Sequence, residues 1–270
     1  MLFLLSPAKT LDYDTPVAAP LRRKASEPLF AEQAAELITV LRRLSSTQVA
    51  GLMDLSEKLA ALNVARYAAW QPLATPTNSK PAVLAFAGDV YDGLQAASLK
   101  TAEFSWAQQH LVILSGLYGA LRPLDRLQPY RLEMGTALKT RGAKDLYGYW
   151  GDTVVEYLNR LQADEAAPVL VNLASQEYAG LVLRPALRRT LRARVVECVF
   201  EEVRDGEARI ISFFAKKARG LMARHAVQNR VRSVKALQAF DAEGYVYESK
   251  ASTADRLVFR RASRTAGWAK

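Results

Sequence analysis

The sequence predicts a single α/β domain with α+β character, in which helices surround a central mixed sheet. In the first two thirds of the chain, apolar runs of strand length alternate with helix-period segments, which favours parallel strands joined by helices. Hairpin-like segments follow, and hairpin strands are antiparallel. No Gly- or Pro-rich linker divides the chain, so we expect one domain over residues 1–259 and a basic, flexible tail over residues 260–270.

The expected strands are short apolar runs bounded by polar, Gly or Pro residues. They cover residues 2–5, 82–86, 111–114 and 169–173. Asp205-Gly206 is a dipeptide typical of a two-residue hairpin turn. The strands joined by that turn are expected at residues 194–204 and 208–214, and a last hairpin at residues 245–248 and 256–259.

The expected helices follow from apolar residues that recur every three or four positions. Residues 34, 37, 38, 41 and 44 are apolar, which predicts an amphipathic helix over residues 32–44. A pair of helices follows at residues 47–53 and 59–70, and a basic helix is expected at residues 215–228. Proline-punctuated loops are expected at residues 11–28 and 71–81.

Positive charge is concentrated in two segments of the chain. The 37 Lys and Arg residues exceed the 27 Asp and Glu residues, giving a net charge of +10. Residues 178–196 and 208–235 contain Lys or Arg but no acidic residue. Such clusters favour a polyanionic partner, chiefly nucleic acid, although general surface basicity would give the same count.

Cysteine and histidine are too scarce for several classes of site. The single cysteine, Cys198, excludes an intramolecular disulfide, and His110 and His225 are far apart, which argues against a zinc site. A carboxylate-bound magnesium site stays open, but we expect no metal and no cofactor. The first residues lack a signal peptide and no stretch is apolar enough to span a membrane, so we expect a cytoplasmic protein without membrane contact.

Polar residues follow the first predicted strand. Ser6, Lys9, Thr10 and Asp12 lie just beyond its C-terminal end, where open α/β sheets bind ligands. Lys9 therefore either faces a site or is a surface lysine on a structured loop. The Ser6-x-x-Lys9 spacing of a serine–lysine nucleophile pair is expected once by chance in a chain of this composition, so it carries no weight.

Two further segments have the character of anion sites. Gly116 and Gly119, with Arg122 and Arg131, could form a loop that binds phosphate, or a tight turn whose arginines bind carbonyl groups. Lys216, Lys217 and Arg219 begin the basic helix, where cations oppose the helix dipole unless an anion or acidic partner answers them. Gly88 and Gly93 have P-loop spacing but lack the lysine, so nucleotide hydrolysis there is not expected.

The helix pair at residues 47–70 contains a third candidate phosphate contact. Residues 52–60, L-M-D-L-S-E-K-L-A, resemble the turn of a helix-hairpin-helix, which holds DNA phosphates through backbone N–H groups and a lysine. Lys58 occupies the lysine position, but Asp54 and Ser56 stand where the motif has glycines. An ordinary helical hairpin is the alternative interpretation.

Several blocks together resemble the bacterial peroxide stress resistance protein YaaA family. They read S-P-A-K-T-L-D from Ser6, G-D-V-Y-x-G-L from Gly88, L-S-G-L-Y-G-x-L-R-P-L-D from Leu114, P-Y-R-L-E-M-G from Pro129, N-L-A-S-x-E-Y from Asn172 and S-F-F-A-K-K-A-R-G-L-M-A-R from Ser212. The resemblance implies an α/β fold outside the common superfolds and induction by hydrogen peroxide. It also implies binding of double-stranded DNA through a helix-hairpin-helix and a basic cleft, and a link to limiting free iron.

Two functional hypotheses follow. The first is a non-sequence-specific DNA-binding protein of the oxidative stress response, bound to double-stranded or structured DNA and without a stable protein partner. Its candidate DNA contacts are Lys58, Lys9, Arg122, Arg131, Lys216, Lys217, Arg219 and Arg224. The alternative is an enzyme acting on a phosphorylated or nucleic-acid substrate, with Lys9, Asp12 and Asp125 as acid–base candidates.

Overall fold

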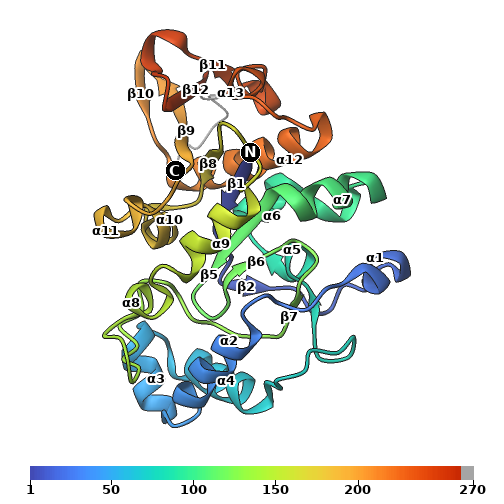
Figure 1. Cartoon of the computed structure of the whole chain (residues 1–270), viewed down its shortest axis with the longest axis vertical. Coiled ribbons are helices and arrows are strands. Elements are labelled where there is room, and N and C mark those ends of the chain that lie inside the picture. The colour runs from blue at the N-terminus through green and yellow to red at the C-terminus, as the bar shows by residue number, and fades with distance from the viewer. Residues whose placement is uncertain (263–270) are drawn as a thin grey trace.

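The computed structural model of the chain describes residues 1–262, without the side chains of Ala186 and Leu187. Its centre is an eight-stranded mixed sheet in the order β11-β12-β9-β8-β1-β5-β6, with β10 beside β9 (Figure 1). The parallel strands are β1 (Leu2–Leu5), β5 (Leu111–Ser115), β8 (Val169–Leu173), β9 (Arg194–Arg204) and β12 (Arg256–Ala262). Antiparallel pairing joins β6 (Gly119–Leu121), β10 (Glu207–Arg209) and β11 (Val246–Tyr247) to them. The predicted mixed-sheet α/β class is confirmed.

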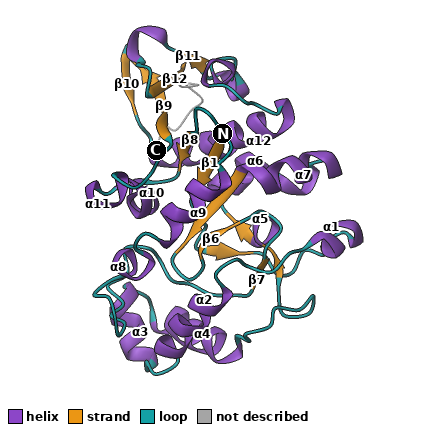
Figure 2. Ribbon diagram, viewed as in Figure 1, coloured by secondary structure: helices purple, strands orange, loops and turns teal. Residues whose placement is uncertain are grey.

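Helices cover the sheet, as Figure 2 shows. The longer ones are α2 (Ala31–Leu41), α3 (Ser46–Met53), α4 (Glu57–Ala69), α7 (Thr101–His110), α9 (Thr153–Leu161), α10 (Gln176–Leu183) and α12 (Ser212–Asn229). The shorter ones are α1 (Ala19–Lys24), α5 (Ala82–Ala85), α6 (Asp89–Leu94), α8 (Leu146–Trp150), α11 (Pro185–Arg188) and α13 (Val234–Leu237), with 3₁₀ turns η1 (Ala96–Ser98), η2 (Ala242–Gly244) and η3 (Ser249–Ala251). Two small sheets pair β2 (Thr10–Leu11) with β4 (Phe86–Ala87), and β3 (Lys80–Pro81) with β7 (Arg126–Leu127).

The buried strands explain why the core forms where it does. Every residue of β1 and β5 is buried, as expected for parallel strands covered on both faces. Helix α12 packs against β1, β8 and β9, and α7 packs beside it on β1. Within residues 1–262, no helix combines the length and the apolar character that a bilayer span requires.

The structure corrects four of the predicted elements. Residues 82–86 are the single helical turn α5 followed by β4, not a strand, because a short apolar run is compatible with either form of burial. Strand β10 ends at Arg209 and α12 already begins at Ser212, so the predicted strand 208–214 is too long and the helix prediction starts three residues late. The loop predicted over residues 11–28 contains β2 and α1.

Strand β12 extends into the segment that was expected to be a C-terminal tail. Residues Arg260, Arg261 and Ala262 extend β12 and pair with Glu201, Glu202 and Val203 of β9. Arg261 donates to both carboxylate oxygens of the buried Glu202 at 2.8 and 2.9 Å. The sheet therefore extends past residue 259, and the rest of the predicted tail, residues 263–270, lies outside the described residues.

Candidate functional site

A cavity of about 510 Å³ opens at the C-terminal ends of β1 and β8. The strand order places β5 on one side of β1 and β8 on the other. The order in which the chain adds strands to the sheet therefore reverses at β1, although these three strands are parallel. Open α/β sheets bind ligands at such a reversal, outside the carboxyl ends of the strands. The charged groups of the pocket are Lys9, Arg131, Lys216, Arg219, Asp89, Glu133 and Glu177. The pocket thus brings together four of the predicted cations with three carboxylates.

Two serines join the ends of β1 and β8 at the base of this pocket. The backbone N–H of Ser175 donates to Oγ of Ser6 at 2.8 Å, and the two hydroxyls lie 3.3 Å apart. Ser175 also caps α10, because its Oγ accepts from the N–H of Tyr178. Lys9 pairs with Glu133 rather than with Ser6, so the Ser6-x-x-Lys9 spacing produces no serine–lysine pair.

Glu133 binds two of the predicted cations. Its carboxylate lies 2.7 Å from Nζ of Lys9 and 2.9 Å from Nη2 of Arg131. Burial alone would raise the pKa of Glu133, but the hydrogen bonds from Lys9 and Arg131 hold that pKa below its usual value. Glu133 is therefore ionised at neutral pH and neutralises part of the positive charge expected of a basic cleft.

The cations of α12 do not all face the pocket. Lys216 lies at the pocket mouth with Nζ 4.0 Å from Asp89, and it is half exposed. Lys217 turns to Glu243, with Nζ and Oε1 2.5 Å apart. Arg224 donates to the carbonyl oxygens of Leu94 and Gln95, at 3.0 and 3.1 Å, at the end of α6. Lys217 and Arg224 therefore lie outside the pocket and have protein partners.

Arg219 differs from every other cation of the pocket. Its side chain is partly buried and lines the cavity, and its guanidinium makes no hydrogen bond or ion pair with any residue in the described range 1–262. Burial lowers the pKa of Arg219, and the charge of Glu197 only partly opposes this effect. A buried charge normally has a partner, because its desolvation is otherwise uncompensated.

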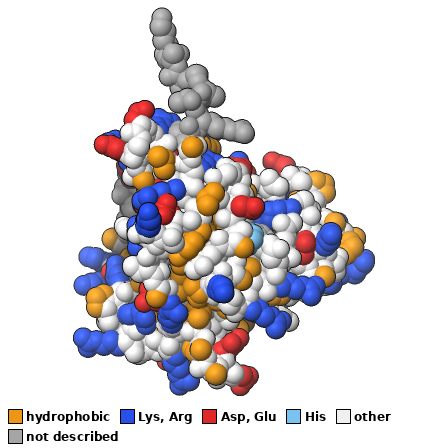
Figure 3. All heavy atoms as spheres, turned by 90° about the horizontal axis from the view of Figure 1, so that it is seen from above, with side chains coloured by type: hydrophobic (Ala, Val, Ile, Leu, Met, Phe, Trp, Pro, Cys, Tyr) orange, Lys and Arg blue, Asp and Glu red, His pale blue; other side chains and the backbone are white. Residues whose placement is uncertain are grey.

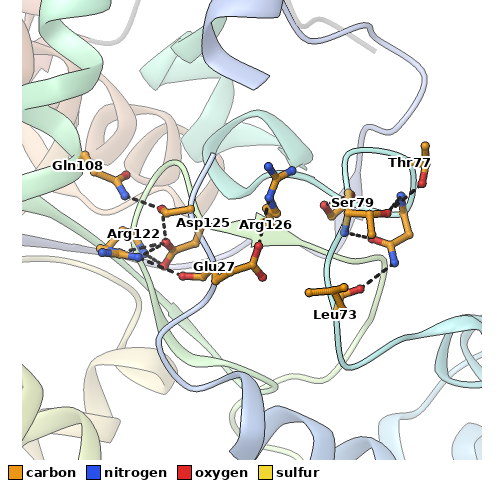
Figure 4. Close-up of polar contacts among 11 residues, drawn as sticks. Glu27, Leu73, Thr77, Ser79, Gln108, Arg122, Asp125 and Arg126 are labelled. Carbon is orange, nitrogen blue, oxygen red and sulfur yellow. Dashed lines mark hydrogen bonds and ion pairs between the residues drawn. The ribbon is translucent and has the colours of Figure 1, made fainter. Parts of the chain in front are cut away.

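Asp125 and Arg122 lie in a closed network outside the pocket (Figure 4). The Asp125 carboxylate is fully buried and accepts from the backbone N–H of Arg122 at 2.8 Å, from its Nε at 3.0 Å and from the Ser26 hydroxyl at 2.7 Å. Burial raises the pKa of Asp125 despite the neighbouring Arg122. This network holds the loop after β6 in place and leaves the carboxylate no access to a substrate in the pocket.

Asp12 is also occupied by its own loop. Its Oδ1 accepts from the backbone N–H groups of Asp14 and Thr15, at 3.0 and 2.9 Å, and its Oδ2 lies 3.2 Å from Nζ of Lys80. The Thr15 backbone hydrogen bond, aided by Lys80, lowers the pKa of Asp12 to about 2. An acid–base role for Asp12 at neutral pH does not fit this environment.

The glycines predicted as possible phosphate contacts are required by packing. A Cβ on Gly116 would lie 2.2 Å from the carbonyl oxygen of Leu132, and one on Gly119 would meet the Trp150 ring at 2.7 Å. Gly119 also has φ of +64°, in the left-handed region that favours glycine. The structure therefore supports the tight-turn interpretation of this segment.

The predicted helical hairpin is present at α3 and α4. Asp54 has φ of +51° and so takes the left-handed conformation that a glycine would favour at this turn. Ser56 caps α4 by accepting from the N–H of Leu59 at 3.4 Å, so that donor is already satisfied within the protein. Lys58 is exposed on the first turn of α4 and does not line the pocket.

A basic surface that the predicted sites did not include lies around α11. Its exposed cations lie in one short stretch of the chain, from the end of α10 through α11 to the segment that follows. They are Arg184, Arg188, Arg189 and Arg192, and we call this set the α11 surface. Among residues 1–262, none of them has a carboxylate partner within ion-pair distance. The acid-free run 178–196 contains all four of these cations, and Arg184 also lies 3.3 Å over the ring of Tyr147 on α8.

Figure 3 shows how Lys and Arg side chains are distributed on one face of the molecule. They gather along the left margin, the side on which α11 lies in Figure 1. Further Lys and Arg side chains lie along the right-hand side of the same view, where acidic and hydrophobic groups are mixed with them. The exposed positive charge is therefore uneven.

Comparison with known proteins identifies the family. The family model described as "Peroxide stress protein YaaA" matches residues 1–251. A UPF0246 protein of Leptothrix cholodnii is 62% identical over 261 residues, covering 97% of this chain and 98% of the relative. A UPF0246 protein of Bordetella avium is 59% identical over 261 residues, covering 97% and 99%. These matches support a role in peroxide stress, and the chain belongs to the peroxide stress protein YaaA family.

Proposed function

We propose that this chain is a DNA-binding protein of the peroxide stress response that contacts duplex phosphates without reading bases. The observation that carries the proposal is the α11 surface, where exposed cations lie together without carboxylate partners. Phosphate contacts from Lys and Arg supply most non-specific affinity for DNA, and each released counterion makes binding more sensitive to salt. Unpaired cations serve this purpose best, because no internal ion pair has to be broken first.

The predicted DNA contacts differ in their availability for this role. Lys58 and Lys216 are exposed, so they can reach phosphates at modest cost. Other cations are held by carboxylates or backbone carbonyls, so DNA would have to share or displace those partners; they are Lys9, Arg122, Arg131, Lys217 and Arg224. Lys58 and the α11 surface are therefore the contacts that we place first in the proposal.

The proposal bears on iron held at the DNA and not on the total pool of free iron. A protein that neutralises DNA phosphates releases the cations condensed around them. Ferrous ions held near the duplex belong to that cation atmosphere, so coverage by this protein would lower the iron that can react with peroxide at the DNA itself. In this mechanism the protein protects DNA by displacing iron, without holding the metal.

A salt titration of duplex binding tests the proposal. If about six phosphates are neutralised, log K should fall against log salt with a slope of about −5 on two unrelated sequences. Replacing Arg188, Arg189 and Arg192 together by Gln should lower that slope by about three, and Lys58→Ala should lower it by about one. The matched control replaces Arg22, Arg23 and Lys24 of α1, which are also exposed, and should change the slope little.

The outcomes of this titration distinguish binding at the α11 surface from a general effect of net charge. An equal loss of slope in the α1 and α11 triple variants would mean that net charge, not the α11 surface, governs binding. Affinity that does not change with salt would exclude the phosphate-contact mechanism altogether.

A second candidate function is an enzyme acting on a phosphorylated substrate in the pocket. The observation that favours it is the concave site at the sheet reversal, where cations and the carboxylates of Glu133 and Glu177 are interleaved. Simple phosphate binding does not need those carboxylates. Release of phosphate or another product from a phosphorylated substrate, lost on changing Glu177 or Lys9, would decide in its favour.

A further inference from the structure

Arg219 is a cation of the pocket that has no carboxylate partner among residues 1–262. Lys9 and Arg131 share Glu133, and Lys216 faces Asp89, but the guanidinium of Arg219 has no such partner within residues 1–262. An arginine carries five N–H donors and stays charged, so its burial is unfavourable unless an acceptor is supplied. The fold nevertheless holds this side chain against the cavity instead of letting it extend into solvent.

The packing of α6 against α12 fixes that position. A Cβ on Gly220, the residue after Arg219, would lie 1.8 Å from the carbonyl oxygen of Val90, and one on Gly93 would lie 2.2 Å from that of Lys217. Only glycine allows the two helices to approach this closely. Arg219 lies one helical turn from Lys216, and residues three apart share a helix face, so both cations line the same side of the cavity.

We propose that this pocket binds a small phosphorylated molecule, with its phosphate seated on Arg219 and Lys216. The planar guanidinium fork matches two phosphate oxygens, and Lys216 adds a point charge beside it. The other walls are provided by apolar groups, including Leu132, Val90 and the ring of Tyr178. The volume lies in the range of cofactor and metabolite sites, which suits a ligand of mononucleotide size better than a bare ion.

The ligand is a free molecule and not a segment of duplex DNA. A duplex presents its phosphates on a convex, rigid surface, whereas Arg219 lines a concave cavity. The exposed cations around α11 are available to a duplex without entering the pocket. The inference therefore does not rest on DNA binding, and it refines the second candidate function without requiring turnover.

Thermal shift and calorimetry with defined probes test this site. The probes are inorganic phosphate, pyrophosphate and AMP, added to the full chain. Binding should raise the melting temperature of the wild-type protein, because a ligand that binds only the folded state stabilises it. In Arg219→Gln the affinity should fall about tenfold or more, since a charge-assisted bidentate contact is lost.

Two further variants control for misfolding and for a general loss of positive charge. Lys216→Gln changes a half-exposed side chain and should fold normally, yet still weaken the probes. Arg232→Gln removes the same charge from an exposed site near His110, outside the pocket lining, and should bind as the wild type does. Equal affinity in wild type, Arg219→Gln and Lys216→Gln, or no binding of any probe at millimolar concentration, would overturn the inference.

A competition experiment distinguishes the two possible sources of the phosphate. Pyrophosphate at a concentration that saturates the pocket should leave a labelled duplex bound, and α11 variants should keep their affinity for pyrophosphate. If pyrophosphate displaces the duplex in the wild type but not in Arg219→Gln, the pocket takes DNA phosphate and the small-molecule assignment is wrong. Failure of duplex binding alone leaves the probe measurements unaffected.

Discussion

Gly220 of α12 lies directly against the carbonyl oxygen of Val90 on α6, so closely that a Cβ would be 1.8 Å from that oxygen. The approach is backbone to backbone, so no side-chain rotation could make room for a Cβ at this position. It positions Arg219 beside the pocket and brings Asp89, at the start of α6, to the pocket mouth. Of the two glycines with P-loop-like spacing, Gly93 serves helix packing, because it makes the reciprocal contact with Lys217.

Gly220→Ala should destabilise the protein by about 3 kcal/mol, because an added methyl group must force two backbones apart. Gly51→Ala is the matched control: Gly51 is also in a helix, and a Cβ added there would have no atom within 4 Å. That change should stabilise by about 0.5–1 kcal/mol through helix propensity. Chemical denaturation measures both, and a neutral Gly220→Ala would show that the helices separate easily.

Arg219→Met should raise the stability of the ligand-free protein by on the order of 1 kcal/mol. The change removes a charge that is partly desolvated and has no ion-pair partner within residues 1–262, and it leaves no other group unpaired. Arg224→Met provides the contrast, because that guanidinium bonds the carbonyl oxygens of Leu94 and Gln95 and its loss should cost about 1–3 kcal/mol. A marked loss of stability in Arg219→Met would mean that the protein itself satisfies Arg219.

Truncation after Phe259 should destabilise the fold, although the sequence pattern places the domain boundary there. Arg261 lies between the rings of Phe214 and Tyr245, 4.7 and 4.6 Å from their centroids, and pairs with the buried Glu202. Removing one partner of a buried pair costs about 3–5 kcal/mol. A chain ending at Ala262 is the control, and equal melting temperatures for the two truncations would refute the role of Arg261.

Acidification from pH 7 to 5 should weaken the fold through the two histidines. Burial lowers the pKa of His110 and of His225 below the ordinary value of about 6.5. The folded state therefore binds these protons less readily than the unfolded state, so stability is greatest above pH 6.5 and is lost as the pH falls through the folded values. His110→Asn should flatten this pH dependence, and an unchanged profile would assign it to other groups.

The sequence predicts the core of the fold better than its connections. Runs such as 2–5 and 169–173 are mostly apolar, so their own residues are enough to predict that they are buried strands. The pairing of Leu2 with Leu170 could not be predicted from the sequence, because it joins segments far apart in the chain. That pairing also creates the pocket, which explains why Lys9 was predicted while Ser175 and Glu177 were missed. Cations were recognisable by charge, but their partners depend on tertiary contacts, as Lys217 and Glu243 show.

Cys198 should react very slowly with thiol reagents in the folded protein. It lies on β9 with 4% of its surface exposed, and burial raises the pKa of its thiol to about 12. The nucleophilic thiolate is therefore scarce at neutral pH, and a reagent reaches the sulfur only when the strand opens. Labelling with a thiol reagent should proceed at the rate of unfolding and accelerate in denaturant. Rapid labelling of the native protein, or stoichiometric oxidation by peroxide at the same rate as free cysteine, would instead identify Cys198 as a peroxide sensor.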